Sequence, residues 1–253
     1  MNAKGYKEYT ELNTIPIFLD FPINMVEEIR KATKELPFFW VTCLDVYEAL
    51  RQAGSNNVHF IPLSISDKYY TRTVPLKTCD VIQFGRKNSK LHEYMLKYCT
   101  KKPGTEYVYQ TGDGSLSYES TTRGNLGRFD NREEYFQMLA SCRVSLVSSP
   151  GKDNSRDFGG IDFITPRFYE SAVNYCHMIG RYTNNTEAQI IGIDKICPCV
   201  DTYEQFEEFM DAYLDESDFK DKEAFDRFLT NNVTSVRVQE VMGIVNDCLL
   251  NLS

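Results

Sequence analysis

One short stretch decides the fold class of this chain, and it reads Val81-Ile82-Gln83-Phe84-Gly85-Arg86-Lys87. Residues 81–84 predict a strand, and residues 89–101, which follow the turn, predict a helix. Glycine lets a backbone approach a ligand closely, and arginine and lysine both favour phosphate oxygens. The turn therefore predicts a site for a diphosphate or another anion. An ordinary surface turn with solvated charges is the alternative.

The alternation of strands and helices continues in both directions from this stretch. Strands are predicted at residues 15–19, 38–42, 58–61, 106–109, 144–147, 177–179 and 197–200. Helices are predicted at residues 23–36, 45–53, 132–142, 166–174, 203–214, 222–229 and 236–250. This order implies an α/β fold with a mostly parallel sheet that helices cover on both faces.

Two long polar segments, residues 111–130 and 148–164, are predicted to be loops. Structureless loops of this length are uncommon and often functional. Both follow predicted strands, so both are expected at the carboxyl edge of the sheet. Open α/β sheets bind their ligands at that edge.

A second candidate motif reads Thr165-Pro166-Arg167-Phe168-Tyr169-Glu170. Threonine suits the N-cap of a helix and proline its first position. A cation such as Arg167 is unfavourable at a helix start unless an anion is near, whereas Glu170 complements the helix dipole. The functional interpretation is an anion site. The alternative is that Arg167 pairs with an acid such as Asp162.

The composition limits the classes of protein that remain. The chain has 253 residues, of which 42% are hydrophobic and 25% charged, and this is typical of a globular protein. Its net charge of −8 argues against nucleic acid as a partner. No stretch approaches the ~18 consecutive apolar residues of a membrane span, and the start is too polar for a secretory signal. We therefore expect a cytoplasmic protein without a transmembrane segment, whose eight cysteines are free thiols.

Five segments in order resemble group 1 glycosyltransferases. Residues 165–172 are similar to the family's T-P-R-F-F-E-A motif, and residues 80–87 to its D-V-x-F-x-G-R segment. The other three segments are residues 57–63, 139–146 and 197–214, and the set covers most of residues 38–215. The family usually has glycine five positions after the glutamate. This chain has Tyr175 there, which is expected to narrow the pocket.

The resemblance implies a GT-B-like architecture of two Rossmann-like domains with a cleft between them. Residues 76–235 would form the nucleotide-sugar-binding domain, with a Rossmann-like parallel sheet. Residues 1–75 would form a short, incomplete α/β domain on the acceptor side. Residues 236–253 would form a C-terminal helix, for which packing back on the N-terminal part is one option.

The same resemblance carries roles over to six residues. It assigns Glu170, Arg86 and Lys87 to catalysis, and Gly85, Thr165 and Arg167 to donor binding. The cations would face the donor's diphosphate, and the glutamate would hydrogen-bond hydroxyls of its sugar or ribose. Fixed cations lower the barrier because glycosyl transfer builds negative charge on the leaving diphosphate. No metal and no other cofactor is expected.

The resulting functional hypothesis is a transferase of polysaccharide biosynthesis. It would move a hexose from a nucleotide diphosphate sugar to a glycan or lipid-linked acceptor, in the cytoplasm or at the inner face of the membrane. The alternative is a non-catalytic subunit that binds a nucleotide sugar or a partner. A second transferase chain or a second copy of this chain would then complete the enzyme.

Overall fold

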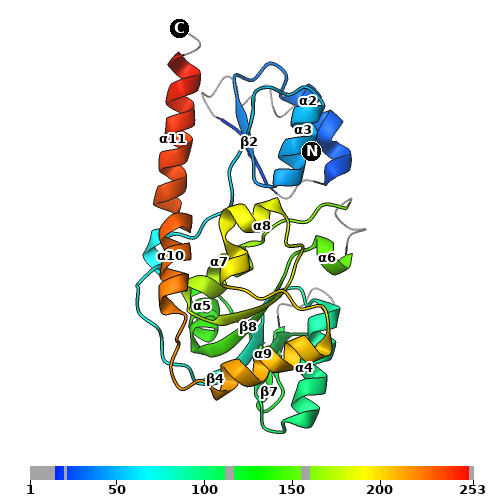
Figure 1. The fold of residues 1–253 in the computed structure, drawn as a ribbon, viewed down its shortest axis with the longest axis vertical. Helices are drawn as coiled ribbons and strands as arrows, with labels where there is room; N and C mark the ends of the chain where they lie inside the picture. Colours follow the sequence, from blue (N-terminus) through cyan, green and yellow to red (C-terminus); the bar gives the residue numbers. More distant parts are fainter. Residues whose placement is uncertain (1–14, 20–21, 112–116, 155–159, 251–253) are drawn as a thin grey trace.

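The computed structural model describes residues 15–19, 22–111, 117–154 and 160–250, except for the side chains of residues 154 and 248–250. Two lobes lie one above the other in Figure 1. We call them the N-terminal lobe, which is built around a sheet of three strands, and the C-terminal lobe, which is built around a sheet of six.

The N-terminal lobe has a parallel sheet in the order β1-β2-β3. Its elements are β1 (Ile17–Phe18), η1 (Ile23–Met25), α2 (Val26–Ala32), β2 (Phe39–Val41), α3 (Leu44–Gln52) and β3 (Val58–Phe60). Phe39 and Val41 of β2 pack against Ile29 of α2 and Leu50 of α3. All three residues of β2 are buried, so both faces of this central strand are covered.

The C-terminal lobe has a mixed sheet in the order β7-β6-β5-β4-β8-β9. The strands β5, β4, β8 and β9 are parallel, and β6 and β7 extend the sheet as an antiparallel hairpin. The strands are β4 (Cys79–Gln83), β5 (Tyr107–Gln110), β6 (Ser117–Ser120), β7 (Gly124–Arg128), β8 (Cys142–Ser148) and β9 (His177–Arg181). The helices around them are α4 (Ser89–Lys101), α5 (Arg132–Ser141), α7 (Pro166–Val173), α9 (Tyr203–Asp215) and α10 (Lys222–Asn232).

Successive residues of β4 point to opposite faces of this sheet, and a separate core lies on each face. Val81 belongs to the core that α4 and α9 cover, together with Leu91 and Phe206. Ile82 belongs to the core on the other face, together with Leu139 of α5. The predicted α/β fold with helices on both faces of a largely parallel sheet is therefore confirmed.

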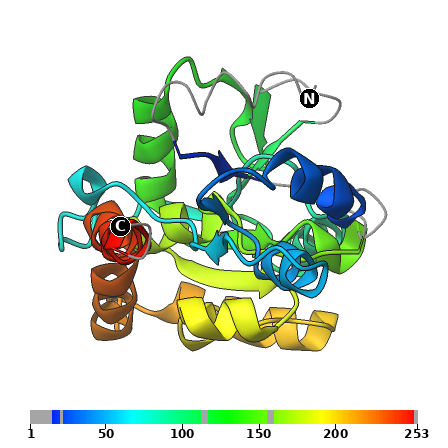
Figure 2. The same cartoon turned by 90° about the horizontal axis from the view of Figure 1, so that it is seen from above.

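A long helix, α11 (Thr234–Leu250), runs from the C-terminal lobe along the side of the N-terminal lobe (Figures 1 and 2). Its residues Val241, Ile244 and Val245 pack against a cluster on the N-terminal sheet that includes Phe38 and Trp40. The connection between the lobes contains η2 (Asp67–Tyr69). The predicted domain boundaries at residues 75 and 235 stay predictions.

None of the helices in the described ranges has the combination of length and apolar character that crossing a bilayer requires.

Both segments that were expected to be loops contain regular structure. The hairpin β6–β7 lies within residues 111–130, and a short helix, α6 (Gly151–Asn154), lies within residues 148–164. Residues 112–116 and 155–159 of these segments lie outside the described residues. A further helix, α8 (Thr186–Ile191), was not predicted. These elements are short and carry few apolar residues, so they leave little periodicity in the sequence.

Candidate functional site

The carboxyl ends of the parallel strands in the C-terminal lobe face the N-terminal lobe. Ile161 and Phe163, which follow β8, are buried in the core of the N-terminal lobe with Val41 and Leu50. The expected ligand edge of the sheet is therefore the edge at which the two lobes meet. The sequence motifs at residues 85–87 and 165–170 both begin at this edge.

Gly85 and Arg167 lie in direct contact there. Gly85 has a φ of +66°, which residues with a Cβ rarely adopt. A Cβ at this position would lie 2.4 Å from Nη2 and 2.7 Å from Nε of Arg167. Glycine is therefore required both for the turn and for the close approach of the guanidinium. The fold brings together two candidate residues that are far apart in the sequence.

The Arg167 guanidinium has no carboxylate partner within the described ranges. It is the second residue of α7, where the helix dipole disfavours a cation. Its neighbours include the hydroxyls of Tyr118 and Tyr135. Burial raises the pKa values of both hydroxyls, and the positive charge of Arg167 acts in the opposite direction. An anion bound at this edge would remove the unfavourable electrostatics of Arg167.

The alternative pairing of Arg167 with Asp162 is wrong. Asp162 accepts hydrogen bonds from Ser149 Oγ at 2.7 Å, from the backbone N–H of Gly151 at 2.8 Å and from that of Thr183 at 2.7 Å. These bonds hold together the loops that follow β8 and β9. The buried carboxylate is therefore structural, and Arg167 is left without it.

Arg86 and Lys87 extend the cationic character of the edge. Arg86 is exposed and, like Lys87, forms no ion pair with any residue in the described part of the chain. The Nζ atom of Lys87 lies 4.9 Å from the ring centroid of Tyr109. Burial and the charge of Lys87 together lower the pKa of the nearby His92 to about 4. His92 is therefore neutral at pH 7, and the positive charge here comes from the two sequence-predicted residues.

Glu170 is buried, and each of its carboxylate oxygens has a partner on α5. Arg132 Nη2 donates to Oε1 at 3.0 Å, and the Tyr135 hydroxyl donates to Oε2. The ring of Tyr135 packs edge-on against Phe84 at 4.1 Å, next to Gly85. Each oxygen keeps a second lone pair that a ligand hydroxyl can use. The sequence reasoning missed Arg132 and Tyr135, because no motif marks either residue within the helix predicted at residues 132–142.

Thr165 is buried at the N-cap position of α7, but its side chain does not cap the helix. Its hydroxyl is a buried polar group without a hydrogen-bond partner among the described residues. Such a group costs about 1–3 kcal/mol relative to a paired one. The hydroxyl is therefore a candidate for a polar partner that the described residues do not supply.

A network that the sequence reasoning missed holds the turn after β4. Asp153 of α6 accepts hydrogen bonds from Arg181 at 2.7 and 2.8 Å and from the side chain of Asn88. Asn88 in turn caps α4 by accepting from the backbone N–H of Leu91 at 3.0 Å. The turn that carries Gly85 and the end of β9 are therefore fixed to one another. Asp153 lies in the polar segment 148–164 and Arg181 ends the buried strand β9, and the sequence does not indicate that the two would pair with each other and with Asn88.

Tyr175 does not narrow the candidate site, and that expectation is wrong. It lies at the amino end of β9, whereas Gly85 lies at the carboxyl edge of the sheet. Its ring packs near Phe219 and Phe225, and its hydroxyl donates to Asp226. Its φ of +49° keeps the left-handed conformation for which glycine is the usual residue.

A buried acid of α8 connects the two lobes beside this edge. Glu187 accepts hydrogen bonds from the backbone N–H of Leu44 at 2.8 Å and from that of Ile164 at 2.9 Å. Leu44 is the first residue of α3 in the N-terminal lobe, and Ile164 immediately precedes Thr165. Burial raises the pKa of Glu187 to about 7, although the two N–H groups favour its ionised form.

Within the described ranges, no three His, Cys, Asp or Glu side chains are grouped so that they could hold a metal ion. The prediction that the site works without a metal stays a prediction. The edge carries three cations without acidic partners among the described residues, namely Arg86, Lys87 and Arg167. It also carries the buried hydroxyl of Thr165 and the buried acid Glu170. Such a set can bind a polyanion and hydroxyl groups attached to it.

Comparison with known proteins identifies the fold but not a family. No protein-family model matches the sequence. No curated protein matches it either. Among solved structures, a GtfA/B complex superposes with a TM-score of 0.54 and 12% identity, over 89% of this chain and 48% of that chain. The pneumococcal O-GlcNAc transferase GtfA in complex with UDP and GlcNAc gives a TM-score of 0.51 and 10% identity, with the same coverage.

These likenesses show that the chain has a fold of the GT-B glycosyltransferase type. The chain spans about half the length of these two solved chains. Membership of group 1 and a shortened N-terminal domain stay predictions.

Proposed function

We propose that this chain binds a nucleotide diphosphate sugar where Gly85 meets Arg167, and that it transfers the sugar to a glycan or lipid-linked acceptor. The observation that carries the proposal is the Arg167 guanidinium, which is held against Gly85 at the start of α7 without a carboxylate partner among the described residues. The diphosphate of a donor would provide the missing anion. The GT-B type fold and the resemblance in sequence support the same assignment.

The residues of the edge would have different roles in the reaction. Arg167, Arg86 and Lys87 would bind the diphosphate and stabilise the negative charge that grows on it as the glycosidic bond breaks. Thr165 would bond to the same group through its unpaired hydroxyl. Glu170, held by Arg132 and Tyr135, would accept hydrogen bonds from hydroxyls of the sugar or ribose and so orient the donor.

A non-catalytic role as a nucleotide-sugar-binding or partner-binding subunit is the second candidate. The observation in its favour is the apolar edge strand β1, where Ile17 is 52% exposed and the adjoining Leu19 is 56% exposed. Exposed apolar side chains on a strand edge are typical of an interaction surface. One of the matched structures is a complex that carries the name GtfA/B.

The first test is calorimetric titration of the purified chain with UDP, GDP and their common sugar conjugates. Micromolar affinity for one nucleotide is expected. The substitutions Arg167→Ala and Arg86→Ala should each weaken that affinity roughly 10- to 100-fold, because each removes charged hydrogen bonds worth about 1.5–3 kcal/mol. Arg30→Ala is the matched control, since Arg30 pairs with Glu27 on the N-terminal lobe. Unchanged affinity in both site variants would refute the assignment.

Turnover separates the two candidate roles. Release of sugar from the bound donor by the purified chain alone supports the transferase. Tight nucleotide binding without release supports the subunit. In that case, a second transferase-like chain should co-purify with this one, and its addition should restore turnover.

A further inference from the structure

A cavity lies at the junction between the lobes, away from the candidate donor edge. It has a volume of about 430 Å³, and it is lined by β3 and the residues after it, the end of α8 with residues 192–196 that follow, α10 and the start of α11. Pockets for small ligands usually measure roughly 300–1,000 Å³. None of the six candidate residues of the donor edge lines this cavity. It is therefore a separate site for which the proposed function gives no role.

The walls of this cavity are fixed by hydrogen bonds between three elements. The amide of Asn232 on α10 donates to the backbone carbonyl of Ile191 on α8 at 3.2 Å, and its oxygen accepts from Arg237 on α11. Arg237 also donates to both carboxylate oxygens of Glu240, at 2.9 and 3.0 Å. The cavity is therefore preformed, and the positive charge of Arg237 is already neutralised.

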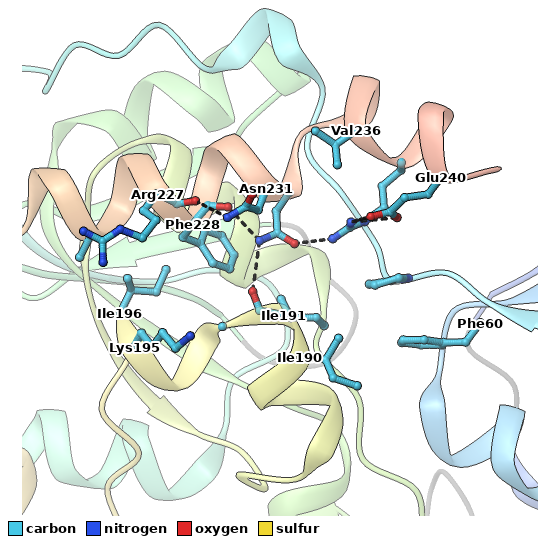
Figure 3. Close-up of a pocket in the computed structure, with 15 residues that line it drawn as sticks. Phe60, Ile190, Ile191, Lys195, Ile196, Arg227, Phe228, Asn231, Val236 and Glu240 are labelled. Carbon is cyan, nitrogen blue, oxygen red and sulfur yellow. Dashed lines mark hydrogen bonds and ion pairs between the residues drawn. The ribbon is translucent and has the colours of Figure 1, made fainter. Parts of the chain in front are cut away.

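Two further cations line the cavity and are not neutralised in this way. Lys195 is exposed and forms no ion pair with any residue that the structure describes. Arg227 pairs only with Glu223, and their side chains are 72% and 90% exposed. Exposed pairs of this kind contribute little. Figure 3 places Arg227 and Lys195 at one end of the cavity, away from Phe60 and Glu240.

Besides these cations and the polar residues Asn231, Asn232, Arg237 and Glu240, the cavity has a large apolar lining. Phe60, Ile190 and Phe228 are its large apolar residues toward the N-terminal lobe and the centre. Ile190 is 60% exposed although it is a large aliphatic residue. An apolar surface next to Lys195, which is unpaired in the described part of the chain, and to Arg227, whose only ion pair there is solvent-exposed, fits a ligand with an apolar body and an anionic head.

We propose that this cavity binds a phosphate monoester that carries an aromatic or other apolar group. A phosphate monoester has a charge of about −1.5 to −2 at pH 7, and this matches the two cations better than a carboxylate does. Lys195 and Arg227 bind the phosphate, and Phe60, Ile190 and Phe228 contact the apolar group. In a chain with a net charge of −8, this end of the cavity attracts an anion that most of the surface repels.

The test is titration of the full chain with 1-naphthyl phosphate, followed by naphthyl fluorescence. Inorganic phosphate and 1-naphthol serve as the two halves of the probe. The whole probe should bind at least tenfold more tightly than either half. Inorganic phosphate that binds as tightly as the whole probe would contradict the proposal, because the apolar wall would then play no part.

Substitutions locate the binding. Lys195→Met and Arg227→Met should each weaken binding of 1-naphthyl phosphate at least fivefold, and Ile190→Ser should weaken it without changing the affinity for inorganic phosphate. All three side chains are exposed, so the thermal unfolding temperature should stay within a few degrees of wild type. Lys34→Met, on the exposed surface of the N-terminal lobe, is the matched control and should change nothing.

Competition distinguishes this cavity from the donor edge. Saturating UDP should not displace the probe, and Arg86→Ala should not change its affinity. Displacement by UDP, or wild-type affinity in the combined Lys195→Met and Arg227→Met variant, would overturn the proposal. Either of these two results would leave the proposed nucleotide-sugar site at Gly85 and Arg167 unaffected, because that site depends on other residues.

Discussion

At the scale of single residues, the contact between Gly85 and Arg167 is the feature on which the donor assignment depends. Both residues were singled out from the sequence, one as a turn before two cations and one as a cation at an unfavourable helix position. Local sequence rules were enough to identify each of the two residues, because the pattern that marks each one spans only a few positions. That the two would touch does not follow from those rules. It needs the parallel order of β4, β8 and β9, which brings residues 85 and 167 to one edge.

The glycine allows a matched test of this contact. Gly85→Ala should weaken nucleotide binding roughly tenfold or more, because the new Cβ would displace the Arg167 guanidinium. Gly104→Ala is the control. Gly104 also has a positive φ, of +98°, but no atom lies within 4 Å of the position its Cβ would take. Both variants should lose stability, and calorimetry should show a loss of affinity only for Gly85→Ala. An equal loss in both would mean that backbone strain, not Arg167, is responsible.

The partners of Glu170 could not be predicted from the sequence. Its helix position suggests a simple interaction with the dipole. The structure instead pairs it with Arg132 and Tyr135 from a different helix. Contacts of this kind depend on how α5 and α7 pack against the same face of the sheet, and no local pattern encodes them.

At the scale of elements, apolar strands, even short ones such as β1, and long helices were predictable, whereas polar strands and short helices were not. In the hairpin β6–β7, Tyr118 alone among the large side chains is buried, and β7 contains two glycines. Such segments form strands because a neighbouring strand, β5, supplies hydrogen bonds to them. Their own side chains provide little of the alternation that predicts a strand.

The packing of α11 on the N-terminal lobe gives a test at this scale. Ile244→Asp should release the helix, since a carboxylate would replace an apolar contact with Phe38 and Trp40. A loss of about 2–4 kcal/mol in the free energy of unfolding is expected. Trp40 is the only tryptophan in the chain and is 1% exposed, so its emission should shift to longer wavelength. Met242→Asp, at a position that is 50% exposed on the same helix, should leave the emission maximum in place. An identical emission maximum in both variants would contradict the packing of α11 against Trp40.

At the scale of the whole molecule, Glu187 of the C-terminal lobe accepts one hydrogen bond from the N-terminal lobe, at Leu44, and one from its own lobe, at Ile164. Its carboxylate joins the start of α3 to the segment before α7. This acid belongs to a helix that the sequence did not predict, and its partners are backbone N–H groups. No residue pattern could therefore have indicated its role.

The raised pKa of Glu187, about 7 against 4.5 for an ordinary glutamate, predicts a dependence on pH. A carboxyl whose pKa is raised by folding stabilises the folded state fully below pH 4.5, and this stabilisation is lost as the pH rises through 7. The loss amounts to at most about 3 kcal/mol. Urea unfolding at pH 5, 6, 7 and 8 should show that the free energy of unfolding of the wild type decreases as the pH rises. In Glu187→Gln the free energy of unfolding should depend less on pH.

The Glu187→Gln variant should also be less stable than wild type at pH 5, because an amide has one acceptor oxygen for two N–H groups. Glu208→Gln is the control, since Glu208 is exposed on α9. It should keep the wild-type dependence on pH. If the free energy of unfolding of Glu187→Gln depended on pH as strongly as that of the wild type, another titrating group would be responsible.

The position of α11 has a consequence for the order in which the chain folds during synthesis. A ribosome releases the N-terminal lobe first, yet one face of its sheet is covered by residues 241–245, which follow every other described element. Until those residues emerge, Phe38 and Trp40 remain exposed to water and to other nascent chains. The early part of the chain therefore keeps an apolar face uncovered until α11 is synthesised, and its maturation should be timed by the completion of that helix.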